Sequence, residues 1–168
     1  FFAVSDGMGG LTNGGDTSEM VARVMPQMIA QDIEELDSAS PDPQRAGMLL
    51  KAAVQNVSDS IAEAANTDGF TGFGATFSGV WLIDRHAVFV NMGDSRAYML
   101  DRYGRLLRQV SIDHNIAQLL VNNGEITREE ARHHPASSQL TRFIGMEPPS
   151  MADVFIEEVC PGDRILLC

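Results

Sequence analysis

The sequence predicts an α+β fold, and two observations support this prediction. Two long stretches come first in which apolar residues recur at helical spacing, at about 16–36 and 44–65. The pattern then changes to short segments rich in β-branched and aromatic residues, separated by turn signals. Helices that precede a run of antiparallel strands are typical of folds in which helices pack on the faces of sheets.

The first helix is predicted over 16–36 and the second over 44–65, with the linker DSASPDPQ between them. Pro26 lies inside the first range, so we expect a kink there or a break into two pieces. The residues that can cap the first helix are Asp16, Thr17 and Ser18. The predicted apolar faces are Val21, Val24, Met25, Met28, Ile29, Ile33 and Leu36 in the first helix, and Leu50, Val54, Val57, Ile61 and Ala65 in the second.

The rest of the chain is predicted to form short strands and short helices. Four strands are expected to form an antiparallel meander: 76–83, 87–91, 96–100 and 106–110. Two short helices follow over 115–123 and 127–134, and Thr127 and Glu130 have the spacing of a capping box in the second. The last two strands, 152–158 and 164–168, are predicted to form a hairpin around the turn CPGD.

Composition limits the classes of function. A length of 168 residues suits a single domain, and the formal net charge of −11 argues against a nucleic acid as partner. No stretch approaches the roughly 20 apolar residues of a membrane helix, and the N-terminus does not resemble a signal peptide. The two cysteines, Cys160 and Cys168, are too few for a disulfide framework and suit a reducing cytoplasm. We therefore expect a cytoplasmic location.

Both ends of the sequence look cut. Phe1 begins inside an apolar run, and the stretch RILLC ends inside another. Native termini are usually polar and frayed. We therefore expect the chain to be a domain that is incomplete at its N- and C-termini.

The stretch VSDGMGG places Asp6 at the end of an apolar run, next to three glycines. Glycines let the backbone and a ligand come close, as sites for hard cations or phosphate require. A Walker loop is excluded because no lysine is near, and a dinucleotide fingerprint fails at Thr12. An EF-hand loop would need a glutamate where Thr17 stands. Taken alone, the stretch also fits an ordinary Asp-Gly turn.

Two further aspartates lie next to predicted strands. Asp94 is in the connection MGDS between two strands, and Asp113 directly follows a strand in SIDHN. Asp94 fits a turn residue that accepts hydrogen bonds from local backbone N–H groups, and it also fits a ligand. Asp113 fits either the N-cap of the helix that starts near Asn115 or a metal ligand. The residues alone leave these alternatives open.

Seven stretches stand in the order found in the metal-dependent protein phosphatases of the PP2C family, and the sequence resembles the bacterial branch of that family over nearly its whole length. These stretches are VSDGMGG, FGATFSG, VNMGDSRAYML, SIDHN, GEITREEARHHP, LTRFIG and GDRILLC. The resemblance implies one PP2C-like domain over 1–168, incomplete at both ends. It also implies a β-sandwich of two antiparallel sheets flanked by helix pairs, in an α-β-β-α order.

The resemblance implies a reaction as well. Members of the family hydrolyse phosphoserine and phosphothreonine in proteins, with a water or hydroxide activated between two Mn²⁺ or Mg²⁺ ions. Phosphoproteins made by a Ser/Thr kinase are then the expected substrates. Two such ions would offset the charge of the incoming phosphate, so that an acidic protein can act on an anion. Carboxylate and carbonyl oxygens suit these hard ions, and no His/Cys cluster competes for them.

The metal ligands carry over residue by residue. Asp6 matches the carboxylate that bridges the two ions, and Gly7 matches the residue whose backbone carbonyl binds one of them. Asp113 matches the aspartate that holds a third, weaker ion in bacterial members. Residues 114–146 match the flap segment that borders the site and varies with substrate.

Other matches concern support of the site. Gly74, Ala75 and Thr76 match a buried structural turn. Asp94 and Ser95 match a motif that we expect to support the metal ligands.

The sequence also departs from the family pattern. Met8 stands where eukaryotic members have a histidine proposed as general acid, so the resemblance names no acid here. His114 has no catalytic task in the motif, and His86, His133 and His134 are expected at the surface. The phosphate-binding arginine is expected upstream of Phe1 and further metal-binding aspartates downstream of Cys168. We therefore expect this segment alone to be inactive.

Two alternative functions remain at this point. One is a non-catalytic PP2C-like module that binds phosphoproteins or regulates other proteins, and the residues after Cys168 would discriminate it from an enzyme. The other is an interaction domain in which Asp6 is only a turn residue. That alternative predicts no Mn²⁺ binding that depends on Asp6.

Overall fold

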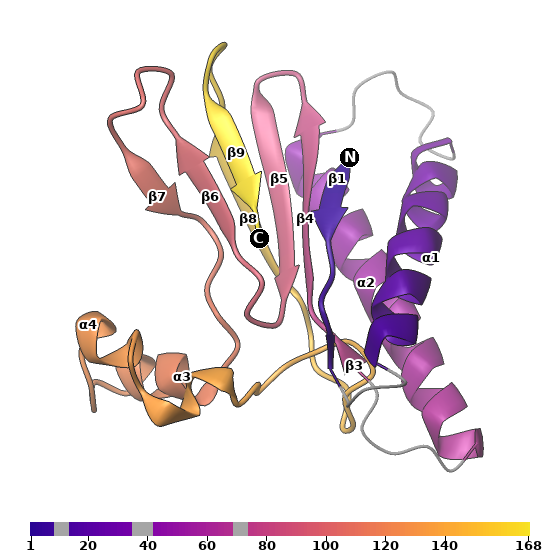
Figure 1. Cartoon of the computed structure of the whole chain (residues 1–168). Helices are drawn as coiled ribbons and strands as arrows, with labels where there is room; N and C mark the ends of the chain where they lie inside the picture. Colours follow the sequence, from indigo (N-terminus) through magenta and orange to yellow (C-terminus); the bar gives the residue numbers. More distant parts are fainter. Residues whose placement is uncertain (9–13, 35–41, 69–73) are drawn as a thin grey trace.

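The computed structural model describes residues 1–8, 14–34, 42–68 and 74–168. Its elements in chain order are β1 (Phe2–Val4), β2 (Gly7–Met8), α1 (Gly14–Glu34), α2 (Pro43–Asp68), β3 (Gly74–Ala75), β4 (Phe77–Ile83), β5 (His86–Met92), β6 (Ala97–Leu100), β7 (Leu107–Gln109), α3 (Ile116–Asn122), α4 (Arg128–Ala131), the 3₁₀ helix η1 (Pro135–Ser138), β8 (Asp153–Glu158) and β9 (Arg164–Leu167) (Figure 1). Long helices come first and short strands follow, as the sequence predicts.

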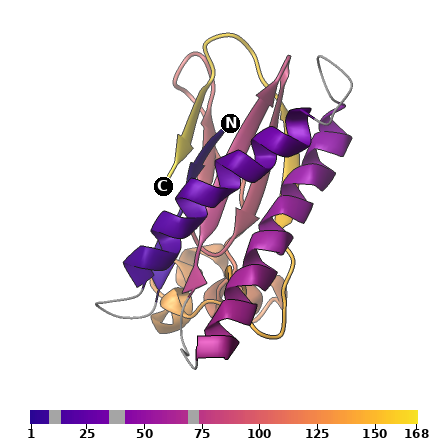
Figure 2. The ribbon, with the colours of Figure 1, turned by 90° about the vertical axis from the view of Figure 1, so that its right-hand side faces the viewer.

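Two antiparallel sheets form the centre of the molecule. One has the strand order β1-β4-β5-β8 and the other the order β7-β6-β9, while β2 and β3 form a small separate ribbon. Helices α1 and α2 lie side by side across one face of the four-stranded sheet (Figure 2). The three-stranded sheet lies on its other side, and α3 and α4 lie at one end of the molecule (Figure 1). The predicted α+β sandwich is therefore confirmed, with one helix pair in the described residues.

The helix pair packs on the sheet through the apolar faces predicted from the sequence. Along α1 the side chains of Val21, Met25 and Ile29 are buried, at the spacing of one helical turn. Along α2 the buried apolar residues include Leu50, Val54, Val57 and Ile61. They pack with Trp81, Val88 and Val90 of the sheet. Leu36 lies outside the described residues.

Helix α1 runs without interruption through Pro26, so the predicted break is wrong. A proline inside a helix costs about 3 kcal/mol because it removes one hydrogen bond and crowds the preceding turn. Met25 and Ile29, which lie before and after Pro26 in the helix, are both buried in the core against the sheet. Burial of such a side chain stabilises a fold by about 1.5–3 kcal/mol. Packing therefore offsets the local penalty. The helix also begins at Gly14, so the three predicted capping residues lie inside it.

A second core lies between the two sheets. It contains Val80, Ala87, Phe89, Ala97 and Val110. Strand β8 serves both cores: Val154 and Ile156 pack with the helix-side core, while Phe155, which lies between them in the sequence, packs with the core between the sheets. This alternation is the two-residue period of a strand that is covered on both faces.

The pairing of the strands corrects two predictions. The expected meander is interrupted, because β5 belongs to the four-stranded sheet and β6 to the three-stranded one. The expected hairpin of the last two strands does not form, because β8 pairs with β5 and β9 pairs with β6. A turn signal marks where the chain reverses, but it does not show whether the chain stays in its sheet or crosses to the facing one.

The flap segment, predicted over 114–146, contains the two short helices. Asn115 caps α3 by accepting a hydrogen bond from the backbone N–H of Gln118 at 2.8 Å, so the capping alternative for Asp113 is wrong. The capping box of Thr127 and Glu130 is confirmed at the start of α4. This helix is shorter than predicted and is followed by η1, because a residue before proline, here His134, is driven into extended backbone.

Within the described ranges, no helix combines the length and the apolar character needed to cross a membrane.

Candidate active site

The main chain at Asp6 is fixed by Thr76. Val4 of β1 lies opposite Ser78 of β4, so the chain that continues from Val4 runs beside Thr76. The Asp6 N–H donates to Thr76 Oγ1 at 3.0 Å, and the Thr76 N–H donates to the Asp6 carbonyl at 2.8 Å. The Ser5 hydroxyl donates to the Thr76 carbonyl at 2.8 Å. The backbone of Asp6 is therefore held on both sides, while the residue itself is exposed at the surface.

Thr76 also holds the loop that carries Asp94. Its hydroxyl lies 2.6 Å from the hydroxyl of Ser95, and both side chains are buried. Gly93 has φ +109°, and a Cβ at this position would lie 2.7 Å from Thr76 Cβ. Only glycine allows both this conformation and this close approach. Asp6 and the two neighbours of Asp94 in the loop, which are far from it in the sequence, thus contact one buried threonine.

Asp94 lies in the electrostatic field of the other two candidate aspartates. Burial raises the pKa of the Asp94 carboxyl, and the charges of Asp113 and Asp6 raise it further. A backbone hydrogen bond and the charge of Arg96 act in the opposite direction. Asp94 is half-buried, and it lines a pocket whose opposite wall comes from the flap.

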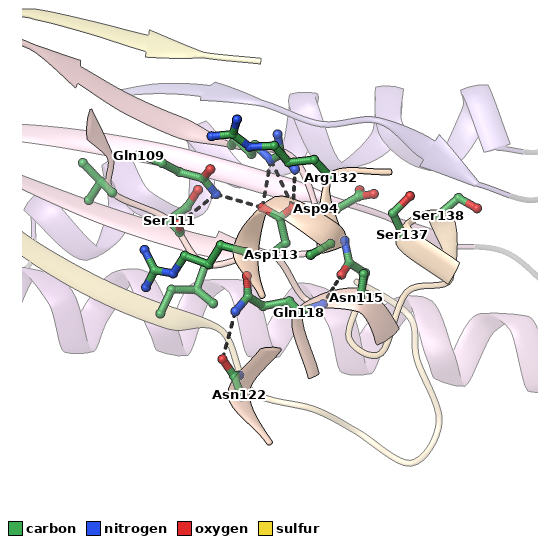
Figure 3. A pocket seen from close by; sticks show the side chains of 16 residues that line it. Asp94, Gln109, Ser111, Asp113, Asn115, Gln118, Asn122, Arg132, Ser137 and Ser138 are labelled. Carbon is green, nitrogen blue, oxygen red and sulfur yellow. Dashed lines mark hydrogen bonds and ion pairs between the residues drawn. The ribbon is translucent and has the colours of Figure 1, made fainter. Parts of the chain in front are cut away.

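The carboxylate of Asp113 is occupied by protein donors. Arg96 Nε lies 2.9 Å and 3.0 Å from its two oxygens, and one terminal nitrogen of Arg96 lies 2.6 Å from Oδ2. The Gln109 amide donates to Oδ1 at 2.9 Å (Figure 3). The Asp113 side chain is only 7% exposed, and its hydrogen bonds raise the pKa of Arg96 above the ordinary value. Asp113 is therefore the buried partner in a bidentate ion pair with the partly exposed Arg96.

His114 joins three parts of the structure, a role that sequence reasoning missed. Its Nδ1 accepts a hydrogen bond from the Gly93 N–H at 3.1 Å, so the proton of the neutral ring is on Nε2. Nε2 donates to Asp153 Oδ2 at 3.1 Å, and Asp153 Oδ1 in turn accepts from Arg142 at 2.8 Å. The only signal in the sequence is the position of His114 beside Asp113.

The other histidines lie away from these contacts. His133 is exposed, as expected, while His86 and His134 are half-buried. His134 Nδ1 accepts the Ala136 N–H at 3.1 Å, at the start of η1.

The end of the flap is attached to the ribbon next to Asp6. Ala75 exchanges two backbone hydrogen bonds with Ile144, at 3.2 Å and 2.8 Å. A Cβ at Gly74 would lie 2.5 Å from a ring carbon of Phe143. The stretch predicted as a buried turn is indeed buried, and its first two residues form strand β3, which pairs with β2.

A pocket of about 540 Å³ lies between the flap and the edge of the three-stranded sheet. Asp94, Arg96 and Asp113 line it on the sheet side, and Arg128 and Arg132 line it on the side of α4. Figure 3 shows side chains from these segments around one hollow.

Comparison with known proteins identifies the family. The family model described as protein phosphatase 2C matches residues 1–149. This chain belongs to the protein phosphatase 2C family. The match confirms the family that the seven sequence stretches predicted.

Bacterial serine/threonine phosphatases are similar to this protein phosphatase 2C chain in sequence and in structure. The serine/threonine phosphatase stp of Listeria monocytogenes is 31% identical over 166 residues, which are 98% of this chain and 63% of the relative. The structure of the serine/threonine phosphatase PstP/Ppp of Mycobacterium tuberculosis superposes with a TM-score of 0.79 at 31% identity, over 98% of this chain and 66% of that one. The catalytic domain of PstP in complex with two manganese ions gives a TM-score of 0.76 at 28% identity, over 98% and 64%. The chain thus spans less than two thirds of the length of these relatives.

The residues of this protein phosphatase 2C chain fit a hard divalent ion only in part. The Asp6 carboxylate is exposed, and carboxylate and carbonyl oxygens are the donors that Mn²⁺ and Mg²⁺ prefer. Asp113 does not fit, because its two oxygens already accept hydrogen bonds from Arg96 and Gln109. In the described part of the chain, no group of three or more His, Cys, Asp or Glu residues could hold a metal ion.

Proposed function

We propose that the protein containing this chain is a Mn²⁺- or Mg²⁺-dependent phosphatase that hydrolyses phosphoserine and phosphothreonine in proteins. The observation that supports this proposal best is the Asp6–Thr76–Ser95 arrangement. It holds the main chain of an exposed aspartate and carries the Asp94 loop alongside, in a member of the protein phosphatase 2C family. A manganese complex of one similar catalytic domain supports the choice of ion.

We assign the Asp6 carboxylate and the Gly7 carbonyl as ligands of the two core ions. As the further carboxylate ligand we propose Asp94 and not Asp113. The charge of Asp6 acts on Asp94, and the Asp94 carboxylate forms no ion pair among the described residues, whereas Asp113 is paired. Divalent ions at this place would lower the pKa of a bound water and offset the charge of a phosphate.

The protein's own part is to position Asp6 and Asp94. Thr76 and Ser95 fix the main chain behind both carboxylates, so these groups are oriented before a substrate arrives. The half-buried residue after Gly7 is Met8, whose thioether cannot deliver a proton to a leaving group. The general acid of this phosphatase is therefore not a side chain at that position.

Phosphoproteins made by Ser/Thr kinases are the proposed substrates, and the cytoplasm is the proposed location. Cys160 and Cys168 are free and exposed, which suits a reducing compartment.

The experiment measures phosphate release from a phosphothreonine peptide by the full-length protein with Mn²⁺. We expect turnover that a chelator abolishes. Asp6→Asn should lower kcat/KM by about 100-fold or more, because it removes a charge that would hold both ions. The matched control is Asp59→Asn on the exposed side of α2, which should keep wild-type activity.

Two results would contradict the proposal. Asp6→Asn with activity within a few-fold of wild type would exclude a bridging role for Asp6. A wild-type protein that binds the peptide without hydrolysing it would instead be the non-catalytic phosphoprotein-binding module.

A further inference from the structure

Arg96 shares the pocket with two aspartates, Asp94 and Asp113. It follows Asp94 by two residues, both residues line the pocket, and its charge acts on Asp94. The Arg96 side chain is 43% exposed, so burial does not fix its position and its hydrogen bonds must do so. Whichever carboxylate Arg96 contacts is neutralised and becomes a poorer partner for a second cation.

Three groups of contacts keep the Arg96 side chain on Asp113 and not on Asp94. Nε and one terminal nitrogen contact Asp113, and the other terminal nitrogen donates to the Tyr98 hydroxyl at 3.3 Å. Gln109 donates to the same carboxylate, which orients it toward the guanidinium. A bidentate, charge-assisted pair of this kind is among the stronger hydrogen-bonded contacts in proteins.

A metal role for Asp113 conflicts with these contacts. To bind an ion, the Asp113 carboxylate would have to give up the hydrogen bonds that it accepts from Arg96 and Gln109, and these donors would lose a buried acceptor. Giving up charge-assisted hydrogen bonds to a buried carboxylate is unfavourable. The contacts of Asp113 therefore favour a role other than the metal ligand that the resemblance implies.

We propose that Asp113 is a positioning residue: it acts as the counter-ion that holds Arg96 away from Asp94, so that Asp94 remains open to a divalent ion. This inference rests on the proposed function, in which Asp94 faces the metal site. Loss of the Asp113 charge would release Arg96, and the carboxylate of Asp94 in the same pocket would become its alternative partner.

The test is a double-mutant comparison of Mn²⁺ binding by the full-length protein, measured by calorimetry. We expect Asp113→Asn to weaken the most weakly bound ion about 10-fold, because a released unit charge would compete at Asp94. Adding Arg96→Gln to this variant should restore affinity to within about 3-fold of wild type, because the competitor is gone. Asp59→Asn on α2 is the matched control and should not change binding.

The outcomes discriminate the alternatives. If Asp113 were a ligand, the double variant would stay as weak as Asp113→Asn, and this result would overturn the inference. Unchanged binding by Asp113→Asn would overturn it too, while wild-type protein that binds no Mn²⁺ would overturn the proposed function together with it. If Asp113→Asn does not fold, as judged by circular dichroism, the double variant and Asp113→Glu decide: both should bind Mn²⁺, whereas a ligand role predicts loss in the double variant.

Discussion

At the scale of single residues, the uncharged side chains do most to organise the site. Thr76 contacts Asp6 through both its backbone and its hydroxyl, and it contacts Ser95 as well. The sequence identified Asp6 because an acid among glycines is conspicuous. It could not show that Thr76 connects Asp6 with Ser95, because hydrogen bonds between distant segments leave no mark on spacing.

Thr76→Val should destabilise the fold and lower activity together. The change keeps the shape but leaves the Asp6 N–H and the buried Ser95 hydroxyl without the partner that they share. A buried polar group without a partner costs about 1–3 kcal/mol, so we expect a loss of that size in denaturant unfolding. Thr76→Ser keeps the hydroxyl and should retain most of the stability. Equal losses in both variants would show that the methyl group matters and the hydrogen bonds do not.

Gly93→Ala should cost more than the same change at Gly104. Both glycines have positive φ, +109° and +69°, so alanine is strained at each. A Cβ at Gly104 meets nothing within 4 Å, whereas one at Gly93 meets Thr76. We expect about 1 kcal/mol at Gly104 and at least twice as much at Gly93, measured by thermal unfolding. Similar losses of stability at the two positions would mean that Thr76 can shift to make room for the added methyl group at little cost.

At the scale of elements, predictability follows the range of the interactions. The helices, the capping box at Thr127 and the extents of most strands were predicted because local spacing and local hydrogen bonds decide them. Sheet membership was not, because it depends on which distant strand a segment meets: β8 and β9 each read as strands, yet each pairs with a different sheet. The ion pair of Asp113 was missed for the same reason, since Arg96 lies 17 residues away in the sequence, in the connection between β5 and β6.

The contact between the flap and β8 should make stability depend on pH. The hydrogen bond from His114 lowers the pKa of Asp153 from 3.8 to about 2, against the effect of burial and with help from Arg142. A carboxyl with a lowered pKa stabilises the fold fully above its unfolded pKa and loses this effect as pH falls through its folded pKa.

We therefore expect a decline between about pH 4 and pH 2, worth about 1–2 kcal/mol after allowance for the 31% exposure of the Asp153 side chain. Urea unfolding at several pH values should show a smaller decline for Asp153→Asn than for the wild type. The same pH dependence in both would exclude this contact as its source.

At the scale of the whole molecule, the charge of the chain opposes binding of the proposed phosphorylated substrate. The formal net charge is −11, and it repels an anionic peptide at long range. Arg128 and Arg132 nevertheless line the pocket beside Asp94. Arg96 is neutralised by Asp113, and the exposed pair of Arg132 with Glu129 is of a kind that contributes little. The α4 side of the pocket therefore presents two arginines, Arg128 and Arg132, and the exposed pair of Arg132 with Glu129 can open when an anionic ligand approaches.

If the protein is the proposed phosphatase, phosphopeptides with acidic residues next to the phosphorylated position should be better substrates than peptides with neutral ones. Arg128 and Arg132 would contact those acidic side chains while the phosphate lies near Asp6 and Asp94. The double variant Arg128→Gln with Arg132→Gln should lower kcat/KM for the acidic peptide about 5-fold and leave kcat/KM for the neutral peptide nearly unchanged. The difference between the peptides should be smaller in 0.5 M salt, where the screening length falls to about 4 Å.

The matched control is Arg85→Gln, on the exposed turn between β4 and β5, which should alter kcat/KM for neither peptide. An equal loss for both peptides would mean that the arginines support the flap and do not contact the substrate, because a structural defect does not distinguish one peptide from the other.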